Sequence, residues 1–353
     1  MRNLSMEVRV PSLVRVKPDA LHKIGKYLRT EGFDEVALYY GEGMEKLFGE
    51  KVSISFASSE IKALTKKEIA THSIEDIFAE STKLKLKSRA IVAIGGGKVI
   101  DFCKYLGFIN QLPVVSVPTS ISNDGFCSPL SSLLVNKRRR TVKSLIPYGV
   151  IVDTRIVQNS PKRFIYSGMG DLFCKLTSIF DWKLAYNRKG IYVDDFAAVI
   201  AQNAVDAFIY YDNRNLEDLE YIRIIASSLM MSGMAMAIAD SSRPSSGSEH
   251  LVSHAYDKVA EKPSLHGLQV GVASYAVSYI QEATHPMLKK VVQECGFLDF
   301  VSQNPLSRKD FIEAVKLAPG IKEDYYTVLS ERGAIERLLE FIDKDEIINR
   351  MLA

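Results

Sequence analysis

The amino-acid sequence predicts an α/β domain with a parallel sheet, followed by an all-α domain. In the first part of the chain, short apolar runs alternate with helical segments, and this βαβα rhythm is typical of a parallel sheet covered by helices on both faces. From Lys162 onward, long helical patterns replace the strands. A chain of 353 residues is also longer than one simple core usually organises. We therefore expect two domains, at residues 1–158 and 159–353.

The predicted elements of the first domain alternate along the chain. Short runs rich in β-branched and aromatic residues indicate strands, and apolar residues recurring every three or four positions indicate helices. In chain order we expect a helix over 19–32, a strand over 35–43, a helix over 44–49, a strand over 52–58, a helix over 73–88, a strand over 89–97, a helix over 98–109 and a strand over 112–120.

The second domain shows helical periodicity with almost no strand signal. The clearest segments cover residues 197–211, 218–242, 267–284 and 308–318, and a final amphipathic helix is expected over 333–352. The second of these segments contains a methionine-rich stretch. Flexible apolar side chains of this kind are more typical of a packed core than of a cofactor site.

Composition excludes several classes of protein. A net charge of +3 is too small to indicate a nucleic-acid partner, and no apolar run reaches the roughly 20 residues of a membrane-spanning helix. The N-terminus lacks the apolar core of a secretory signal peptide. The four cysteines are scattered without a paired spacing, which is typical of a reducing compartment. We expect a cytoplasmic protein that does not insert stably into membranes.

A glycine triplet lies between a predicted strand and a predicted helix. Gly95, Gly96 and Gly97 are followed by Lys98. Glycines let a backbone approach closely, and the N–H groups at a helix start bind anionic oxygens, so the turn is a candidate for the phosphates of a dinucleotide. The alternative is a tight turn without a ligand. Asp101, one turn into the helix, would order the loop or contact a cofactor hydroxyl.

A polar loop, PTSISNDG at residues 118–125, follows the next predicted strand. It would lie at the same edge of the sheet, so that its hydroxyls and the Asp124 carboxylate face the same crevice. Such a run is otherwise simply a turn. Further on, the basic run from Lys137 to Arg140, with Lys143, is by default a solvated surface loop and alternatively attracts an anionic substrate.

Three of the six histidines fall within residues 240–267. Serine and glycine before His250 favour a helix start, and the helix that follows would place His250 and His254 one turn apart on one face. Residues 262–264 end that helix, and His266 begins another. Helix ends that carry imidazoles across a short loop can converge on one metal ion. An isolated HxxxH pair, however, is more often a chance match.

A glycine-rich segment, residues 168–171, is expected to open the first helix of the second domain. Asp171 would lie at the helix start with Lys175 one turn later, the usual places for an acidic cap and an i,i+4 ion pair. Asp171 is also the best acidic candidate to complete a site with His250 and His266, although spacing alone does not select it from the other carboxylates. Two imidazoles and one carboxylate leave a position open on a divalent metal, as in catalytic sites.

Several segments of the chain resemble one family. In order they are GGGKVID, PTSISNDG, IVD, GMGDLFCKLTSIFDWKLA, SSRPSSGSEHLVSHAYD and LHG. They resemble the sn-glycerol-1-phosphate dehydrogenases, a branch of the superfamily of iron-containing alcohol dehydrogenases, glycerol dehydrogenases and dehydroquinate synthases. GDLFCK and SRPSSGSEHLVSH are specific to this branch, whereas the glycine triplet is common to the superfamily. The resemblance implies a dehydroquinate synthase-like fold, with a nucleotide-binding first domain and a metal-binding second domain.

The resemblance implies a role for each matched residue. Asp171, His250 and His266 would bind Zn²⁺, and the residues in contact with the substrate and its reacting atoms would be Asp124, Asp171 and His254. NAD(P) would be held by the two loops, at Gly95, Gly96, Gly97, Lys98, Asp101, Thr119, Ser120, Ser122 and Ser128. Leu268 departs from the family, which often has Glu there. The resemblance also suggests a homo-oligomer.

The implied reaction is the reduction of dihydroxyacetone phosphate to sn-glycerol 1-phosphate by NAD(P)H, which supplies phospholipid backbones. Zn²⁺ would polarise the ketone, and His254 would carry the proton. Lys175, Arg243 and residues 137–143 are cationic candidates for the substrate phosphate. Ni²⁺ or Fe²⁺ would accept the same three ligands. Glu42, in the turn that ends the segment 35–43, leans towards NAD, but a glycine at the contact position would admit either nucleotide, so the choice between NAD and NADP stays open.

Three alternatives remain open. A dehydrogenase for another polyol or phosphosugar would use the same metal and nucleotide. A dehydroquinate-synthase-like lyase is disfavoured, because family members of that kind place Glu where this chain has Asp171. A non-catalytic relative would be expected to have lost at least one of Asp171, His250 and His266, and all three are present.

Overall fold

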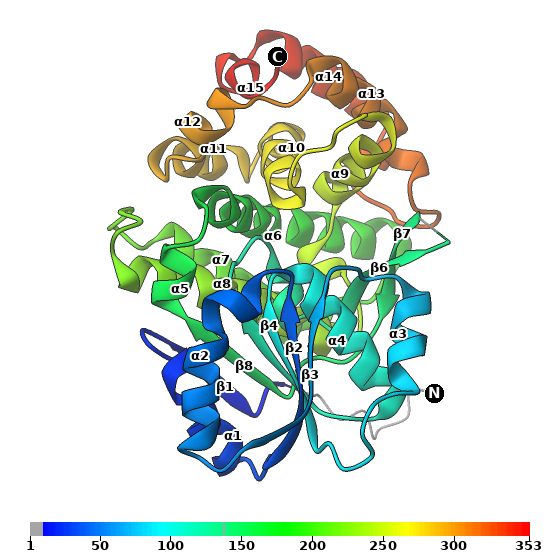
Figure 1. Cartoon of the computed structure of the whole chain (residues 1–353). Coiled ribbons are helices and arrows are strands. Elements are labelled where there is room, and N and C mark those ends of the chain that lie inside the picture. The colour runs from blue at the N-terminus through cyan, green and yellow to red at the C-terminus, as the bar shows by residue number, and fades with distance from the viewer. Residues whose placement is uncertain (1–9, 137) are drawn as a thin grey trace. The chain divides into compact units, whose positions relative to one another are not determined.

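A computed structural model of the chain describes residues 10–136 and 138–353 (Figure 1). The chain forms two compact units. The first comprises Met1–Ser160 and Leu216–Ile238, and the second comprises Pro161–Asn215 and Ala239–Ala353. The first unit therefore includes a helix, α8 (Leu219–Ala239), that we assigned to the second domain from its sequence.

A six-stranded parallel sheet organises the first unit. Its strands follow the order β1 (Leu13–Lys17), β8 (Gly149–Asp153), β5 (Val114–Pro118), β4 (Ala90–Gly95), β2 (Glu35–Gly41) and β3 (Lys62–Ile69), and every pairing is parallel. Strands β4, β5 and β8 are buried along their whole lengths, as expected for apolar strands covered on both faces. The predicted fold of this region is confirmed.

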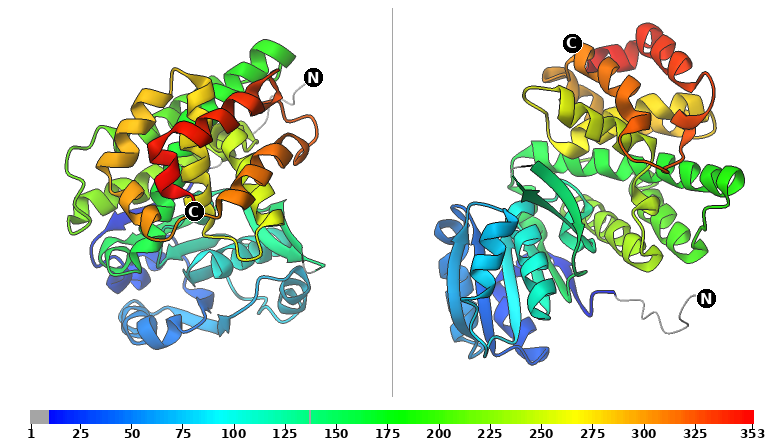
Figure 2. Two further views of the ribbon diagram at one scale, coloured as in Figure 1. Left: turned by 90° about the horizontal axis from the view of Figure 1, so that it is seen from above. Right: turned by 90° about the vertical axis from the view of Figure 1, so that its right-hand side faces the viewer.

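Helices pack on both faces of the sheet (Figure 2). Successive residues of a strand point to opposite faces. Tyr40 of β2 joins an apolar cluster with Ile24 and Phe56, whereas the ring of Tyr39 lies 6.2 Å from that of Phe102 on the other face. The helices of this region are η1 (Leu21–Lys23), α1 (Ile24–Thr30), α2 (Met44–Ala57), α3 (Ile74–Ser81), α4 (Gly97–Asn110), η2 (Asp124–Cys127) and α5 (Thr154–Gln158).

Two predictions for this region were wrong or incomplete. Residues 52–58 form the last turns of α2 rather than a strand, because Val52, Ser55 and Phe56 bury one helical face. Strands β1, β3 and β8 were missed. Strand β3 lies at the edge of the sheet and is exposed along most of its length, so that its sequence carries no apolar run.

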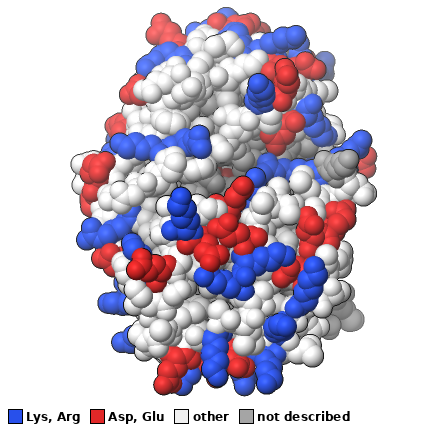
Figure 3. Space-filling model, viewed as in Figure 1, with Lys and Arg blue, Asp and Glu red and all other residues white. Residues whose placement is uncertain are grey.

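The basic run is a strand and not a loop. Strand β7 (Arg138–Lys143) pairs antiparallel with β6 (Leu130–Val135), and its arginine side chains are exposed. Lys137, which begins the run in the sequence, lies outside the described residues. On the face shown in Figure 3, acidic and basic side chains are interspersed, which fits the small net charge of +3.

Helix α8 has the length and composition of a membrane-spanning helix, with a mean hydropathy of 1.6. However, 61% of its apolar window is buried within the structure, which is typical of a core helix. Of the methionine-rich stretch predicted to be core, Met230 and Met236 are buried, whereas Met231 and Met234 are partly exposed. Gly233 allows α8 to approach η2 closely, because an added Cβ would lie 2.7 Å from the Cys127 backbone.

The second unit is helical in its described residues. It contains α6 (Lys162–Lys189), α7 (Asp195–Ile209), η3 (Arg243–Ser245), α9 (Ser248–Val259), α10 (His266–Gln281), α11 (His285–Glu294), α12 (Phe297–Gln303), α13 (Arg308–Leu317), η4 (Ala318–Gly320), η5 (Val328–Ser330), α14 (Ala334–Lys344) and α15 (Glu346–Met351). The single helix predicted over 333–352 was wrong. Asp345 adopts an extended conformation and accepts a hydrogen bond from the N–H of Ile348, which starts a new helix.

Candidate metal centre and nucleotide-binding loop

Helices α6 and α10 cross with their backbones in contact. A Cβ atom added at Gly170 would lie 2.1 Å from the carbonyl oxygen of Gly267, and one added at Gly267 would lie 1.9 Å from that of Ser167. Only glycine fits at both positions. Asp171 and His266, the sequence neighbours of these glycines, are close together for this reason.

Asp171, His250 and His266 form a group of potential metal ligands. One ligand atom from each residue lies within 4.8 Å of the others. His250 Nε2 is 4.0 Å from Asp171 Oδ1, and the two imidazole rings are 5.0 Å apart. Asp171 and His250 are buried, and His266 is partly exposed. The three residues that sequence reasoning selected are therefore neighbours in space.

The position of Asp171 within its helix was predicted wrongly. Helix α6 begins at Lys162, directly after Pro161, so that Asp171 lies well inside it and does not cap its N-terminus. The glycines before Asp171 serve the contact with α10 rather than a helix start. The predicted ion pair with Lys175 is confirmed at 3.4 Å, and the same ammonium also donates to the Asp171 carbonyl oxygen at 2.7 Å. Both side chains are buried.

His254 lies beside the three potential ligands without belonging to their group. Its ring is 6.1 Å from that of His250, one turn away on α9, and 5.8 Å from that of His266. The side chain is partly exposed. An imidazole at this distance is suited to exchange protons with a molecule bound at the site.

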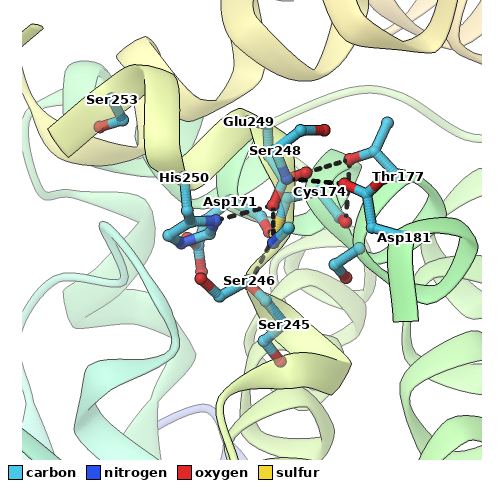
Figure 4. Close-up of polar contacts among 12 residues, drawn as sticks. Asp171, Cys174, Thr177, Asp181, Ser245, Ser246, Ser248, Glu249, His250 and Ser253 are labelled. Carbon is cyan, nitrogen blue, oxygen red and sulfur yellow. Dashed lines mark hydrogen bonds and ion pairs between the residues drawn. The ribbon is translucent and has the colours of Figure 1, made fainter. Parts of the chain in front are cut away.

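Glu249 is a buried carboxylate that sequence reasoning missed (Figure 4). Its Oε1 atom lies 2.9 Å from His250 Nδ1, and its Oε2 atom accepts a hydrogen bond from the Thr177 hydroxyl at 2.8 Å. Glu249 also forms a second group of potential ligands with Cys174 and His250. Its position directly before His250 was the one available signal.

Asp181 is a second buried carboxylate without a sequence signal. Its Oδ2 accepts a hydrogen bond from the N–H of Ser248 at 2.7 Å, and its Oδ1 accepts one from the N–H of Val328 at 2.8 Å. It therefore caps both α9 and η5. Burial, followed by the negative charge of Glu249, raises the pKa of Asp181 from 3.8 to about 7.

The donor set fits a divalent transition metal. Two imidazoles and one carboxylate are borderline ligands that suit Zn²⁺, Fe²⁺ and Ni²⁺. Three protein ligands leave at least one coordination position for a substrate, as in catalytic sites. Both imidazoles, moreover, bind a polar neighbour through Nδ1, an arrangement that orients metal-binding histidines.

In the first unit, the glycine triplet connects β4 to α4. Gly95 has φ +151°, and an added Cβ would lie 2.7 Å from Val99, so that glycine is required. The N-cap residue of α4, Gly96, has no side chain that could bond the first backbone N–H groups of the helix, which suits the binding of an anion there. The Thr119 N–H binds the Gly95 carbonyl oxygen at 3.0 Å, and this bond joins the polar loop to the triplet.

A buried lysine holds the rest of the polar loop. The Lys104 ammonium donates to the carbonyl oxygens of Gly125 and Leu130, and it lies 3.3 Å from the Ser128 carbonyl oxygen and 3.0 Å from Asp101 Oδ1. Ser128 is buried, and its hydroxyl lies among these oxygens. Sequence reasoning did not select Lys104, because a lysine inside an amphipathic helix gives no sign of burial.

The remaining predicted residues of the first unit lie on the same loop. Ser120, Ser122 and Asp124 are partly exposed. Asp124 begins η2, and its Oδ2 accepts a hydrogen bond from the Ser232 hydroxyl of α8 at 2.5 Å. The structure thus brings the glycine triplet and the polar loop together at the carboxyl ends of β4 and β5.

Comparisons with known proteins show which proteins this chain resembles. The family model for iron-containing alcohol dehydrogenases matches residues 15–161. Solved structures of similar fold include a glycerol dehydrogenase from Schizosaccharomyces pombe, with a TM-score of 0.72 at 16% identity over 96% of this chain and 92% of that one. Another is a sulfoacetaldehyde reductase from Bifidobacterium kashiwanohense in complex with NAD⁺, with a TM-score of 0.72 at 14% identity over 98% of this chain and 100% of that one. Identities this low establish the fold alone.

Relatives of higher identity are glycerol-1-phosphate dehydrogenases [NAD(P)+]. That of Methanosphaera stadtmanae is 33% identical over 87% of this chain and 88% of its own length. That of Hyperthermus butylicus is 34% identical over 86% and 88%. The resemblance seen in the sequence motifs is confirmed. The chain belongs to the glycerol-1-phosphate dehydrogenase family, within the superfamily of iron-containing alcohol dehydrogenases.

Proposed function

We propose that this protein catalyses the NAD(P)H-linked reduction of dihydroxyacetone phosphate to sn-glycerol 1-phosphate, and the reverse oxidation. The observation that carries this proposal is the group formed by Asp171, His250 and His266 with His254 beside it. It occurs in a chain about one-third identical to glycerol-1-phosphate dehydrogenases over most of its length.

Asp171, His250 and His266 would hold the metal, for which we propose Zn²⁺. When bound there, the ion would act as a Lewis acid toward the ketone oxygen of the substrate. Ni²⁺ and Fe²⁺ accept the same donors. Analysis of the metal content of the purified protein would show which of the three ions is bound. The buried surroundings of Asp171 and His250 keep water away from one side of the site.

The glycine triplet and the polar loop would hold NAD(P), which supplies or accepts the hydride. Gly95 to Gly97 and the α4 N-terminus would bind the diphosphate, with Lys98, Thr119, Ser120 and Ser122 around it. Asp101 and Ser128 contact Lys104 and would act by holding the loop in place. Glu42 favours NAD, while leaving use of NADP to be measured.

His254 would exchange the proton that accompanies hydride transfer. It is the imidazole of the site that is not needed as a ligand, and its partial exposure allows contact with both water and substrate. Asp124 would bind a substrate hydroxyl, in an orientation fixed by the Ser232 hydroxyl. Asp171 would contribute to substrate binding through the metal that it holds.

The substrate phosphate requires cationic partners. Among our three candidates, the Lys175 ammonium is directed at Asp171 and Cys174. Arg243 is buried and donates to the Tyr326 carbonyl oxygen at 2.7 Å. The arginines of β7 are exposed. We therefore favour the β7 arginines for the first encounter with a phosphorylated substrate.

We also propose a cytoplasmic homo-oligomer without a nucleic-acid partner. All four cysteines are buried thiols outside any disulfide, which fits a reducing compartment. The oligomer is expected from the family resemblance.

The deciding experiment is oxidation of NADH and NADPH with dihydroxyacetone phosphate, on metal-loaded and chelator-treated protein. We expect metal-dependent turnover that yields the 1-phosphate enantiomer. Dihydroxyacetone and glycerol serve as controls. Turnover of the unphosphorylated compounds alone would exclude the proposed substrate and leave a polyol dehydrogenase. Absence of any turnover, despite bound metal and nucleotide, would direct attention to other phosphosugars and then to a non-catalytic role.

A further inference from the structure

We infer that two separate chains of hydrogen bonds set the tautomer of His250 and His266 before the metal binds. One chain ends in a carboxylate that touches the imidazole directly, and the other reaches its imidazole through a neutral hydroxyl. This inference rests on the metal site proposed above. It assigns positioning roles to Glu249, Ser253 and Gln269.

The chain at His250 runs through Glu249 and Thr177. Glu249 Oε1 accepts a hydrogen bond from the Gly247 N–H at 2.6 Å, so this oxygen acts as an acceptor. A carboxylate has no hydrogen to donate, so the hydrogen shared with His250 at 2.9 Å lies on Nδ1. The ring's lone pair is then on Nε2, the atom 4.0 Å from Asp171 Oδ1. Thr177 holds the other carboxylate oxygen at 2.8 Å.

The chain at His266 runs through Ser253 and Gln269. The Gln269 amide nitrogen donates to Asp257 Oδ1 at 3.0 Å and to the Ser264 carbonyl oxygen at 2.9 Å, which fixes the orientation of the amide. Its Oε1 atom accepts the single proton of the Ser253 hydroxyl at 2.8 Å. The serine oxygen can then only accept from His266 Nδ1 at 3.2 Å, which places the lone pair of His266 on Nε2.

All three positioning side chains are buried, so water does not replace them readily. Glu249 and Ser253 have no exposed surface, and Gln269 is 1% exposed. Without these contacts, a neutral imidazole would carry its hydrogen on either nitrogen, and one of the two tautomers would point an N–H toward the metal. The two hydrogen-bond chains exclude that tautomer. Because the carboxylate contacts His250 directly, whereas the second chain reaches His266 through a hydroxyl, loss of Glu249 is expected to weaken metal binding more.

Substitutions of Glu249 separate its hydrogen bonds from its charge. In Glu249→Gln, Oε1 still accepts from Gly247 and His250, and the amide nitrogen can donate to the Thr177 hydroxyl, which already lies 3.1 Å from the Cys174 carbonyl oxygen. Glu249→Ala removes the acceptor entirely. We expect the alanine variant to bind Zn²⁺ about 10- to 100-fold more weakly in competition with a chelator, and the glutamine variant to lose less.

Ser253→Ala breaks the second chain and is expected to weaken Zn²⁺ binding, by less than Glu249→Ala. Ser278→Ala is its matched control. Ser278 is also a fully buried serine, and its hydroxyl lies 2.9 Å from Nδ1 of a histidine outside the site, His285. This control is expected to leave Zn²⁺ affinity unchanged. Thermal unfolding of the metal-free variants shows whether each one is folded.

The tautomers can be read directly in metal-free protein by NMR of ¹⁵N-labelled imidazoles, since the chain has six histidines. We expect Nδ1–H for His250 and His266 in the unmodified protein, and mixed tautomers at His250 in Glu249→Ala and at His266 in Ser253→Ala. Nε2–H tautomers in the unmodified protein would overturn the inference. This readout needs neither metal nor substrate, so its failure is distinct from failure of the proposed reaction.

Metal affinity provides a second way to refute the inference. If Glu249→Ala and Ser253→Ala fold and bind Zn²⁺ as the unmodified protein does, the chains do not position the ligands. Cys174, Glu249 and His250 also lie close enough to share a metal. If Glu249→Gln and Cys174→Ser both weaken binding as strongly as Glu249→Ala, Glu249 is a direct ligand and not a positioning residue.

Discussion

At Asp181, one buried carboxylate receives backbone N–H groups from two segments, Ser248 and Val328. Single residues of this kind connect the helices that carry the site with the rest of the second unit. The buried ionisable groups near the potential ligands include both acids and a base. Asp171, Asp181 and Glu249 are buried acids, and Lys175 is a buried base beside Asp171. Two predictions follow from these charges.

The pKa of Asp181 predicts a pH-dependent stability. Because its pKa is raised to about 7, the folded protein holds this proton more strongly than the unfolded chain. The stability that the protonated Asp181 side chain contributes is fully present at acidic pH and is lost as the pH rises from about 4 to 7. At about 1.4 kcal/mol per pKa unit, this loss amounts to a few kcal/mol at most. The measurement is the free energy of unfolding of chelator-treated protein in urea, taken at several pH values across this pH range. The difference between the unmodified protein and Asp181→Asn should shrink with rising pH, and a constant difference would contradict the assignment.

Lys175→Met is expected to affect the metal-free and metal-bound states in opposite directions. Without metal, the substitution removes the buried ion pair between Lys175 and Asp171, and the loss of one partner of a buried pair costs about 3–5 kcal/mol. With metal, the substitution removes a positive charge beside a divalent cation, so that Zn²⁺ affinity should rise. Unfolding of metal-free protein and chelator competition measure the two effects. Weaker Zn²⁺ binding by a folded variant would show that Lys175 supports the site in another way.

At the scale of elements, the site depends on how closely two helices approach. The contact between α6 and α10 uses glycine at Gly170 and Gly267, and two of the three potential ligands, Asp171 and His266, are their sequence neighbours. In the first unit, Lys104 of α4 holds the polar loop with its ammonium group. In both cases residues inside a helix make close contact with a segment that is distant in the sequence.

Gly170→Ala is expected to separate α6 from α10 and to weaken the metal site. The added Cβ would lie 2.1 Å from a backbone oxygen, which cannot move aside as a flexible side chain would. Overpacking of this kind typically costs about 1–3 kcal/mol. Gly49→Ala in α2 is the control, because its Cβ would meet only the Glu45 side chain at 3.2 Å. Unchanged unfolding and Zn²⁺ affinity in Gly170→Ala would mean that the helices have room to shift.

Lys104→Met is expected to disorder the polar loop and to raise the KM for NAD(P). The ammonium is fully buried and bonds the carbonyl oxygen of Gly125 at the end of the loop and those of Ser128 and Leu130 after it, which methionine cannot do. Zn²⁺ affinity should not change, because the potential ligands belong to the other unit. Steady-state kinetics and chelator competition test the two halves of this prediction. A normal KM in a folded variant would exclude a role for the loop in nucleotide binding.

At the scale of the whole molecule, metal binding should stabilise the folded state. A metal that binds only the native protein adds about 2.7 kcal/mol at a free concentration 100 times its dissociation constant. We therefore expect chelation to lower the Tm and added Zn²⁺ to restore it. Asp171→Ala should show the same Tm with and without metal. A chelator-sensitive Tm in that variant would place the stabilising metal elsewhere.

The sequence by itself determined the parallel sheet, the helical second half, the family and the types of residue available as ligands. Apolar periodicity and the motifs from GGGKVID to LHG are local, and they can be read without knowledge of the fold. Only the tertiary structure decided which side chains meet. It revealed the edge strand β3, the buried Lys104 and the place of Asp171 inside α6. It also supplied the partners of the two imidazoles. The physical reason is that burial and hydrogen bonding between distant segments depend on backbone approach, as at Gly170 and Gly267, and leave no periodic signal in the chain.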